Sequence, residues 1–300
     1  MQTFRGLAAS LVLPTLALAQ VGWVQETRKI SNSEGGFGGT LLERDGFGQS
    51  ATAIGDLDAD GVVDLAVSAV GAGSQGVLWI LFMAPDFTVK SETMVLASGE
   101  NCGAVANVGD LDGDGRNELA LISDPYGVRA LDVLFLRANG TERLRQRTLP
   151  ADPIFFPPIN GDFLDYFGSD LAALGDVDGD GLGDLALGAS GDDDGDGRDN
   201  GAIWIIYLAS DGRPKASKKI SMRHGGGEGL LDTNGLGRSI SSFGDMDGDG
   251  DIELAASVMG DWVVPTDRVA SELLLLYLDA DENVRTVRHL RQQEFGLVGN

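Results

Sequence analysis

Asp176-Val-Asp178-Gly-Asp180-Gly181-Leu-Gly-Asp184 places four carboxylates at positions 1, 3, 5 and 9 of one short loop. Three other stretches repeat this spacing: Asp56-Leu-Asp58-Ala-Asp60-Gly61-Val-Val-Asp64, Asp110-Leu-Asp112-Gly-Asp114-Gly115-Arg-Asn-Glu118 and Asp245-Met-Asp247-Gly-Asp249-Gly250-Asp-Ile-Glu253. Such crowded negative charges repel one another unless a cation lies among them. Oxygen ligands in a flexible loop favour calcium over zinc or copper, and glycine at position 6 permits the sharp turn. The repeat predicts four calcium-binding loops.

The residues around each loop indicate a β-hairpin rather than an EF-hand. An EF-hand needs a glutamate at position 12, where this chain has Val67, Leu121, Leu187 and Ala256. Short apolar runs bounded by glycine and aspartate are typical of strands, and such runs stand on both sides of every loop. They are Ser50–Gly55 with Leu65–Val70, Ala104–Gly109 with Leu119–Ser123, Leu171–Gly175 with Leu185–Ala189, and Ser239–Gly244 with Leu254–Val258.

The repeating unit is longer than the loop. A Phe-Gly or Leu-Gly pair precedes three loops by about ten residues, and Cys102-Gly103 takes its place before the second. A third strand follows each hairpin, and a more polar fourth strand follows that, as in Lys218–Met222 and Val284–Arg288. Units of four strands at this period predict an all-β fold, a β-propeller of four-stranded antiparallel blades. The motif pairs are Phe47-Gly48, Phe167-Gly168 and Leu236-Gly237. The third strands are Val77–Phe82, Leu131–Leu136, Ala202–Tyr207 and Leu273–Tyr277.

This pattern closely resembles the FG-GAP repeat of the integrin alpha-chain N-terminal propeller and its bacterial and algal relatives. The Phe-Gly pair, the Gly-Asp-x-Asp-x-Asp-Gly loop and the Asp/Glu-Leu-Ala strand carry the resemblance, from about residue 25 to the end. It implies about four structural Ca²⁺ ions, each held by the loop carboxylates and the position-7 carbonyl. The implied ligands are Asp56, Asp58, Asp60, Val62 and Asp64; Asp110, Asp112, Asp114, Arg116 and Glu118; Asp176, Asp178, Asp180, Leu182 and Asp184; Asp245, Asp247, Asp249, Asp251 and Glu253. Glutamate at position 9 departs from aspartate, and its extra methylene is expected to loosen two of the sites, although a bidentate glutamate remains a good ligand.

The spacing predicts a partial propeller of about four blades. We place a signal peptide at 1–19, an outer strand and linker at 20–45 and the propeller at 46–300. Its blades cover about 46–100, 101–150, 166–223 and 235–292, with a fifth starting at 294–300. Thr27–Ser31 and the glycines after it match Lys218–Met222, so they resemble an outer strand without its own blade. The resembling family builds seven blades, which this length does not accommodate. We therefore expect a truncated gene model, a fragment, or an array that closes with further blades or a partner chain; a small closed ring is the alternative.

Length, charge and cysteine content describe an exported calcium-stapled chain. Leu7–Ala19 is a short apolar stretch ending in a small-residue cleavage pattern, typical of a secretory signal and too short for a membrane span. The single cysteine, Cys102, has no disulfide partner in the chain and is expected to be a buried hydrophobe. A formal charge of −24 disfavours nucleic acid and anionic membranes as partners.

Other residues give weaker signals. The loop with Asp192, Asp194, Asp196 and Asn200 fits the metal spacing but follows the second strand, so a solvated acidic loop is favoured over a fifth calcium site. His224 and His289 are interpreted as surface residues, Trp79 and Trp204 as packing residues, and Trp262 as a candidate ligand-facing residue. The segment Pro150–Asp165 is a long insert that covers a blade edge or docks a partner.

The absence of a catalytic motif favours a binding module over an enzyme. We expect a secreted adhesion or recognition module whose partner is an extracellular protein or glycan. The alternative is a fragment of a larger extracellular enzyme, a polysaccharide lyase or hydrolase, that carries such repeats. The sequence names neither the ligand nor the oligomeric state.

Overall fold

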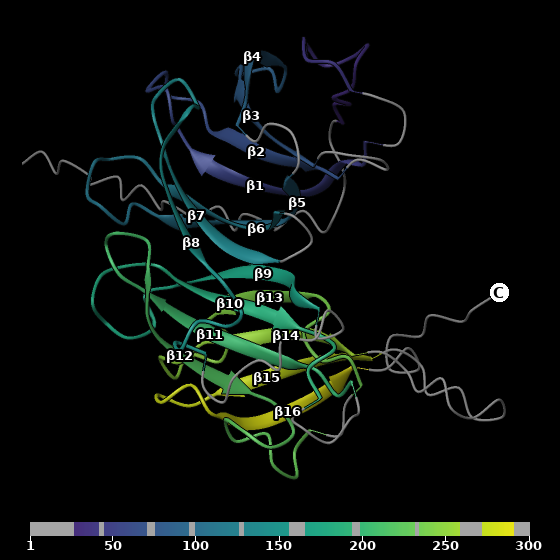
Figure 1. Ribbon diagram of the computed structural model, residues 1–300, viewed down its shortest axis with the longest axis vertical. Coiled ribbons are helices and arrows are strands. Elements are labelled where there is room, and N and C mark those ends of the chain that lie inside the picture. Colours follow the sequence, from purple (N-terminus) through teal and green to yellow (C-terminus); the bar gives the residue numbers. More distant parts are fainter. Residues whose placement is uncertain are drawn as a thin grey trace, which may run out of the picture.

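In the computed structural model, four antiparallel β-sheets account for the regular structure of the described residues, which are 27–41, 45–70, 76–95, 100–125, 129–155, 166–193, 199–231, 234–258 and 272–290 (Figure 1). Each sheet is a meander of four consecutive strands, which we call a blade. Blade 1 has β1 (Phe47–Gly55), β2 (Asp64–Ala69), β3 (Val77–Met83) and β4 (Val89–Met94); blade 2 has β5 (Glu100–Gly109), β6 (Glu118–Pro125), β7 (Ala130–Leu136) and β8 (Glu142–Thr148). Blade 3 has β9 (Phe167–Gly175), β10 (Asp184–Ala189), β11 (Ala202–Leu208) and β12 (Pro214–Ile220); blade 4 has β13 (Ile240–Gly244), β14 (Glu253–Val258), β15 (Glu272–Leu278) and β16 (Val284–Leu290).

The predicted all-β fold of four-stranded antiparallel blades is confirmed. The strand predictions differ at two places. The first strand begins earlier than expected in blades 1 to 3, and the fourth strand of blade 3, predicted at Lys218–Met222, runs from Pro214 to Ile220. Phe47 pairs with Ala69 and Phe167 with Ala189, each across a register shift, so the Phe-Gly pair opens the strand instead of preceding it. A β-bulge of this kind bends a strand without ending its pairing. The signal peptide, Trp262 and the predicted start of a fifth blade lie outside the described residues.

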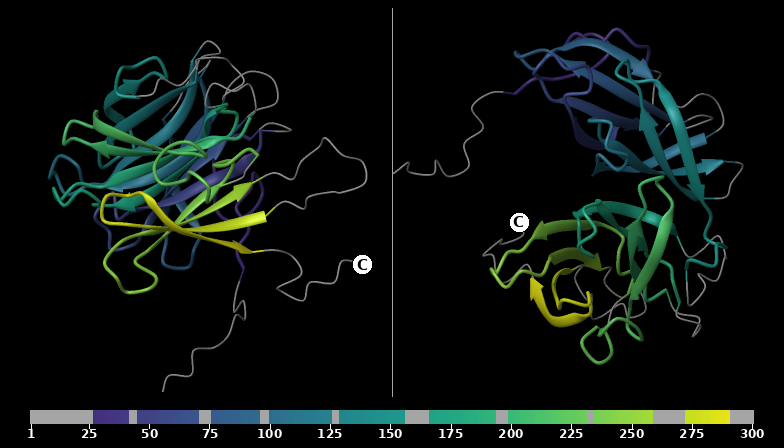
Figure 2. Two further views of the ribbon diagram at one scale, coloured as in Figure 1. Left: turned by 90° about the horizontal axis from the view of Figure 1, so that it is seen from below. Right: turned by 90° about the vertical axis from the view of Figure 1, so that its left-hand side faces the viewer.

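The blades pack face to face in chain order (Figures 1 and 2). One apolar cluster joins blades 1 and 2 through residues such as Ile80 and Leu121, and a second joins blades 2 and 3 through Phe135 and Trp204. A third joins blades 3 and 4 and includes Ile205. Burial of apolar area of this kind is the main stabilising contribution to a β-propeller blade stack.

The described residues form an open series of blades rather than a closed ring. Leu174 on blade 3 is 7 % exposed because blade 4 covers it, whereas its counterpart on blade 4, Phe243, is 53 % exposed. Met246 and Leu273, on the same blade, are 47 % and 40 % exposed. No apolar cluster among the described residues joins blade 4 to blade 1. The structure therefore agrees with a partial propeller.

The N-terminal segment 27–41 makes the contacts of an outer-strand end. The backbone N–H of Val89 donates to the Gly35 carbonyl at 2.8 Å, and Val284 donates to Gly225 at the same distance. A bridge between Ser31 and Glu34 matches the one between Ser221 and His224. Phe37 also covers blade 1, where its ring lies 5.0 Å from that of Trp79 in an edge-to-face arrangement. The match between Thr27–Ser31 and the end of β12 thus extends from sequence to contacts.

The described residues of blade 2 lack the aromatic packing of blades 1 and 3. In blade 3, Phe155 packs edge-to-face on Phe167 and Trp204, each 5.4 Å away. In blade 2, buried Cys102 takes the motif position of Phe167, as predicted for a small hydrophobe. Asp132 takes the ladder position of Trp204, and its buried carboxylate accepts two hydrogen bonds from Arg147 at 2.7 Å. A bonded ion pair thus replaces an aromatic side chain in a blade that still forms all four strands.

Candidate metal centres

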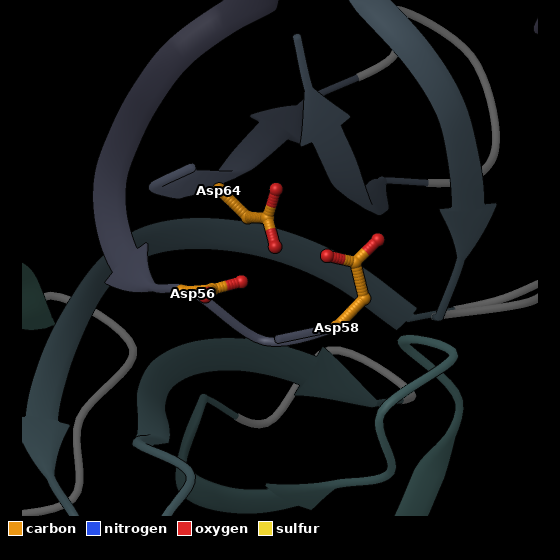
Figure 3. Close-up of side chains that lie close together, drawn as sticks. All are labelled: Asp56, Asp58 and Asp64. Carbon is orange, nitrogen blue, oxygen red and sulfur yellow. The ribbon is translucent and has the colours of Figure 1, made fainter. Parts of the chain in front are cut away.

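Each acidic loop joins the first two strands of a blade, as the sequence predicts. Three acids of every loop, at positions 1, 3 and 9, bring one carboxylate oxygen each within 4.8 Å of the others. Figure 3 shows the three carboxylates of the first loop turned toward a common space. The groups are Asp56, Asp58 and Asp64; Asp110, Asp112 and Glu118; Asp176, Asp178 and Asp184; Asp245, Asp247 and Glu253.

The acid at position 1 folds the loop. In blade 3, the carboxylate of Asp176 accepts hydrogen bonds from the backbone N–H groups of Asp180 at 3.0 Å and Gly181 at 2.8 Å. Position-6 glycines adopt positive φ in all four loops, with values from 86° to 97°. These charge-assisted bonds, together with the glycine conformation, hold the acids of one loop close together.

Position 4 separates blade 1 from the other blades. Gly113, Gly179 and Gly248 adopt positive φ there, and blade 1 has Ala59 with φ of 62°. A side chain disfavours this conformation because its Cβ approaches the following carbonyl. Ala59 therefore has a strained backbone conformation that a glycine at the same position adopts without strain.

Substitutions at position 4 are expected to change stability in opposite directions in blades 1 and 3. Ala59→Gly should raise the free energy of unfolding by about 0.5–1 kcal/mol, and Gly179→Ala should lower it by about 1 kcal/mol. Urea unfolding of both variants beside the parent protein measures the two changes. A loss of stability in Ala59→Gly would contradict the strain argument.

The acid at position 9 is the buried member of each group. Asp64, Glu118, Asp184 and Glu253 are all 0 % exposed. Each accepts a hydrogen bond from the backbone N–H of position 2, at distances from 2.6 to 3.0 Å. Burial raises the pKa of Asp64 and Asp184, and it raises the pKa of Glu118 to about 7. A buried carboxylate is costly when charged, and a bound cation offsets that cost.

Aspartate and glutamate use their second oxygen differently at this position. In blades 1 and 3 it accepts the N–H of the last residue of the third strand, as Asp184 does from Leu208 at 3.0 Å. In blades 2 and 4, Oε1 of Glu118 and of Glu253 is buried without a hydrogen-bond partner among the described residues. Such an oxygen needs a partner, and a hard cation is one that carboxylates bind well. The extra methylene of glutamate thus leaves a carboxylate oxygen unsatisfied beside the loop acids, an arrangement that the expectation of a looser site did not foresee.

The acid at position 5 contacts a basic residue of the fourth strand, which is the outer strand of the blade. The sequence analysis did not predict this contact. In blade 1, Lys90 Nζ lies 2.7 Å from Asp58 and also bonds Asp60; in blade 3, Lys215 Nζ lies 2.7 Å from Asp178 and also bonds Asp180. We call Lys90, Arg143, Lys215 and Arg285 the outer-strand cations. Each stands seven residues after the last residue of the third strand, a regular spacing that could have revealed them.

The position-7 residues place their backbone N–H on the position-5 acid. Val62, Arg116, Leu182 and Asp251 donate at 2.9 or 3.0 Å to Asp60, Asp114, Asp180 and Asp249, respectively. The role of their carbonyls as metal ligands stays a prediction.

Asp192, in the candidate fifth loop, is not solvated. It is 4 % exposed, and its carboxylate lies 2.7 Å from Nζ of Lys219, which lies 5.7 Å from the centre of the Trp204 ring. The favoured interpretation, a solvated acidic loop, is wrong for this residue because a buried lysine binds it. Asn200 is also buried, and Asp194 and Asp196 lie outside the described residues.

The two histidines are half-buried rather than fully exposed. Nδ1 of His224 lies 3.2 Å from the Ser221 hydroxyl, and Nδ1 of His289 lies 2.8 Å from Glu272. Both contacts are local to a blade edge. Trp79 and Trp204 are buried, which confirms their interpretation as packing residues.

Comparisons with known proteins agree with this architecture. The family model described as the FG-GAP repeat matches residues 167–206, which include the third loop. The chain is 28 % identical over 236 residues to integrin alpha pat-2 of Caenorhabditis briggsae, covering 71 % of this chain and 18 % of that protein. It is 31 % identical over 151 residues to integrin alpha-PS5 of Drosophila melanogaster, covering 48 % of this chain and 15 % of that protein.

The chain thus spans less than a fifth of the length of either relative. Within the described ranges, no helix is long and apolar enough to cross a membrane. The loops, the strand order and these similarities agree: residues 167–206 match the FG-GAP repeat, and the chain is similar to integrin alpha chains.

Proposed function

We propose that this protein is a secreted calcium-binding recognition module. The observation that carries the proposal is the buried acid at position 9, which recurs in four loops beside two further carboxylates. In two loops, one oxygen of that acid is buried and has no hydrogen-bond partner in the part of the chain that the structure describes. A Ca²⁺ ion accepts six to eight oxygen ligands in a flexible arrangement, which suits four carboxylates and a carbonyl.

Calcium would fix the hairpin between the first two strands of each blade. The ligands would be the acids at positions 1, 3, 5 and 9 and the carbonyl at position 7, as the resemblance implies. Because the ions would hold loops and not react, they would be structural, and the ordered loops would frame a surface for an extracellular protein or glycan. Similarity to two integrin alpha chains supports adhesion or recognition as the use of that surface.

Native mass spectrometry of the purified protein tests the proposal. We expect about four Ca²⁺ ions per chain at millimolar calcium, since extracellular modules commonly bind with affinities of about 10⁻⁴–10⁻³ M. A matched variant that replaces both Asp176 and Asp178 with asparagine should bind one ion fewer. Equal ion counts for this variant and the parent, or no bound calcium at all, would contradict the assignment.

A second experiment addresses recognition. Immobilised matrix proteins and glycans are probed with the labelled protein in calcium and in chelator. Calcium-dependent retention on one class identifies the partner, and turnover of a polysaccharide in the same assay would favour the enzyme alternative.

A further inference from the structure

The outer-strand cations form a regular system that the proposed calcium sites do not require. All four lie on the second residue of the fourth strand, in β4, β8, β12 and β16. Each contacts the acids at positions 3 and 5 of its own loop, which lie 29 to 38 residues earlier in the chain. The guanidinium of Arg285, for example, lies 3.2 Å from Asp247 and 2.5 Å from Asp249. Because the contact recurs in all four blades, it is a regular part of the repeat rather than a chance surface pair.

These contacts engage the same acids that a metal would use. Position 3 belongs to the three-acid group, and its carboxylate in blades 1 and 3 lies 2.7 Å from a lysine ammonium. Position 5 is the remaining carboxylate expected to bind the ion, yet it lies outside that group and contacts the outer-strand cation. An ammonium bound to two carboxylates relieves their mutual repulsion, as a metal ion would.

The type of cation varies together with the acid at position 9. Lys90 and Lys215 occur with aspartate at that position, in blades 1 and 3. Arg143 and Arg285 occur with glutamate, in blades 2 and 4. A lysine ammonium is a compact charge, whereas an arginine guanidinium is a planar fork that spans two acids. The positive charge is thus retained in every blade although its shape changes.

We propose that the outer-strand cations are tethered competitors of calcium. Each neutralises the acids at positions 3 and 5 when calcium is scarce and yields them when calcium binds, which raises the calcium concentration needed to fill the site. The inference rests on the proposed function, because it concerns the same loops. The opposite role is that the cation positions the acids for the ion, and then its removal would weaken calcium binding.

Neutral substitutions of the two lysines separate these roles. In the variant K90M/K215M, two of the four sites should bind calcium about three- to tenfold more tightly, the range expected when an exposed or half-buried ion pair no longer has to break. The variant K90R/K215R should bind like the parent, because arginine keeps the charge. The variant K29M/K218M removes the same charge away from the loop acids and should also bind like the parent. Calorimetric titration with calcium measures all four proteins.

Lysine labelling of the parent protein reads the displacement directly. Acetylation by an amine-reactive ester, followed by peptide mass spectrometry, should be several-fold faster at Lys90 and Lys215 in calcium than in chelator. Lys218, on the same strand as Lys215, serves as the internal reference and should keep its rate.

The outcomes distinguish the two proposals. Weaker or unchanged calcium affinity in K90M/K215M, or slower labelling of both lysines in calcium, overturns the competition while calcium binding itself stands. An absence of calcium binding in the parent protein overturns the proposed function and the competition together.

Discussion

Removal of calcium is expected to lower the Tm of the purified protein by roughly 15–30 °C. A ligand that binds only the folded state stabilises it by RT ln(1 + [L]/Kd), or about 1.4–2.7 kcal/mol per site at ten to one hundred times Kd. Four loops would together contribute on the order of 6–11 kcal/mol. For a chain of this size each kcal/mol shifts the Tm by about 2–4 °C.

The physical origin of this shift is concentrated charge. The chain has a formal charge of −24, and each loop places at least four acids along nine residues. Burial of the position-9 acid adds a desolvation cost, seen in the raised pKa of Asp64, Asp184 and Glu118. Calcium removes both penalties at once, so its loss should affect every blade.

Scanning calorimetry at 10 mM calcium and in chelator measures the effect. Sodium chloride at matched ionic strength is the control for simple screening of surface charge. Magnesium at 10 mM should stabilise less, because it demands a smaller and more rigid octahedral site. The same Tm in calcium and chelator, or a full shift with sodium chloride alone, would rule out specific calcium stabilisation.

The repeating fold was predictable because the same sequence pattern occurs in every blade. Glycine, spaced aspartates and short apolar runs are local signals, so the four hairpins could be placed from residues such as Asp176 and Gly181. The third and fourth strands followed from the repeat length. The start of the first strand was missed by three or four residues, because pairing of Phe47 and Phe167 across a bulge depends on the neighbouring strand.

Long-range contacts were not predictable from one sequence. Lys90 and Asp60 are thirty residues apart, and the sheet brings them together only because β4 returns beside the loop. Lys219 and Asp192 meet in the same way, within blade 3. Local composition describes Asp192 as part of an acidic loop, whereas the fold buries it against a lysine.

The N-terminal segment shows what a repeat comparison can achieve. Thr27–Ser31 has no blade of its own among the described residues, yet its sequence matched the end of β12. The structure gives Gly35 and Gly225 the same backbone acceptor role. These contacts support the match between the two segments, and the assignment of residues 20–45 as an outer strand and linker stays a prediction.

A change at position 9 is expected to have opposite consequences for aspartate and glutamate blades when calcium is absent. In Asp184→Asn, the amide offers one acceptor for two backbone N–H groups, those of Val177 and Leu208. One donor is left buried and unsatisfied, which should cost about 1–3 kcal/mol in chelator. In Glu118→Gln, the amide oxygen still accepts from Leu111, and the amide nitrogen replaces an oxygen that has no partner among the described residues. Its N–H groups face the loop acids Asp110 and Asp112, which can accept them. That variant should be neutral or more stable in chelator.

Calcium should reverse the second result. Both variants lose a charged ligand, so both should gain less stability from calcium than the parent does. Asp211→Asn, which changes an exposed acid away from the loops, is the matched control and should behave like the parent. Urea unfolding of the four proteins in calcium and in chelator gives the required free energies.

The pH dependence supplies an independent test of Glu118. Burial raises its pKa from 4.5 to about 7, so the folded protein holds a proton that the unfolded chain has lost between these values. Stability in chelator should therefore fall as pH rises from about 4.5 to 7, because the folded state binds more protons there. Asp64 and Asp184, whose pKa is also raised, act in the same direction. Glu118→Gln should flatten this dependence and Asp211→Asn should leave it unchanged. If the free energy of unfolding of Glu118→Gln depends on pH in chelator as steeply as that of the parent, the raised pKa of Glu118 does not cause the dependence.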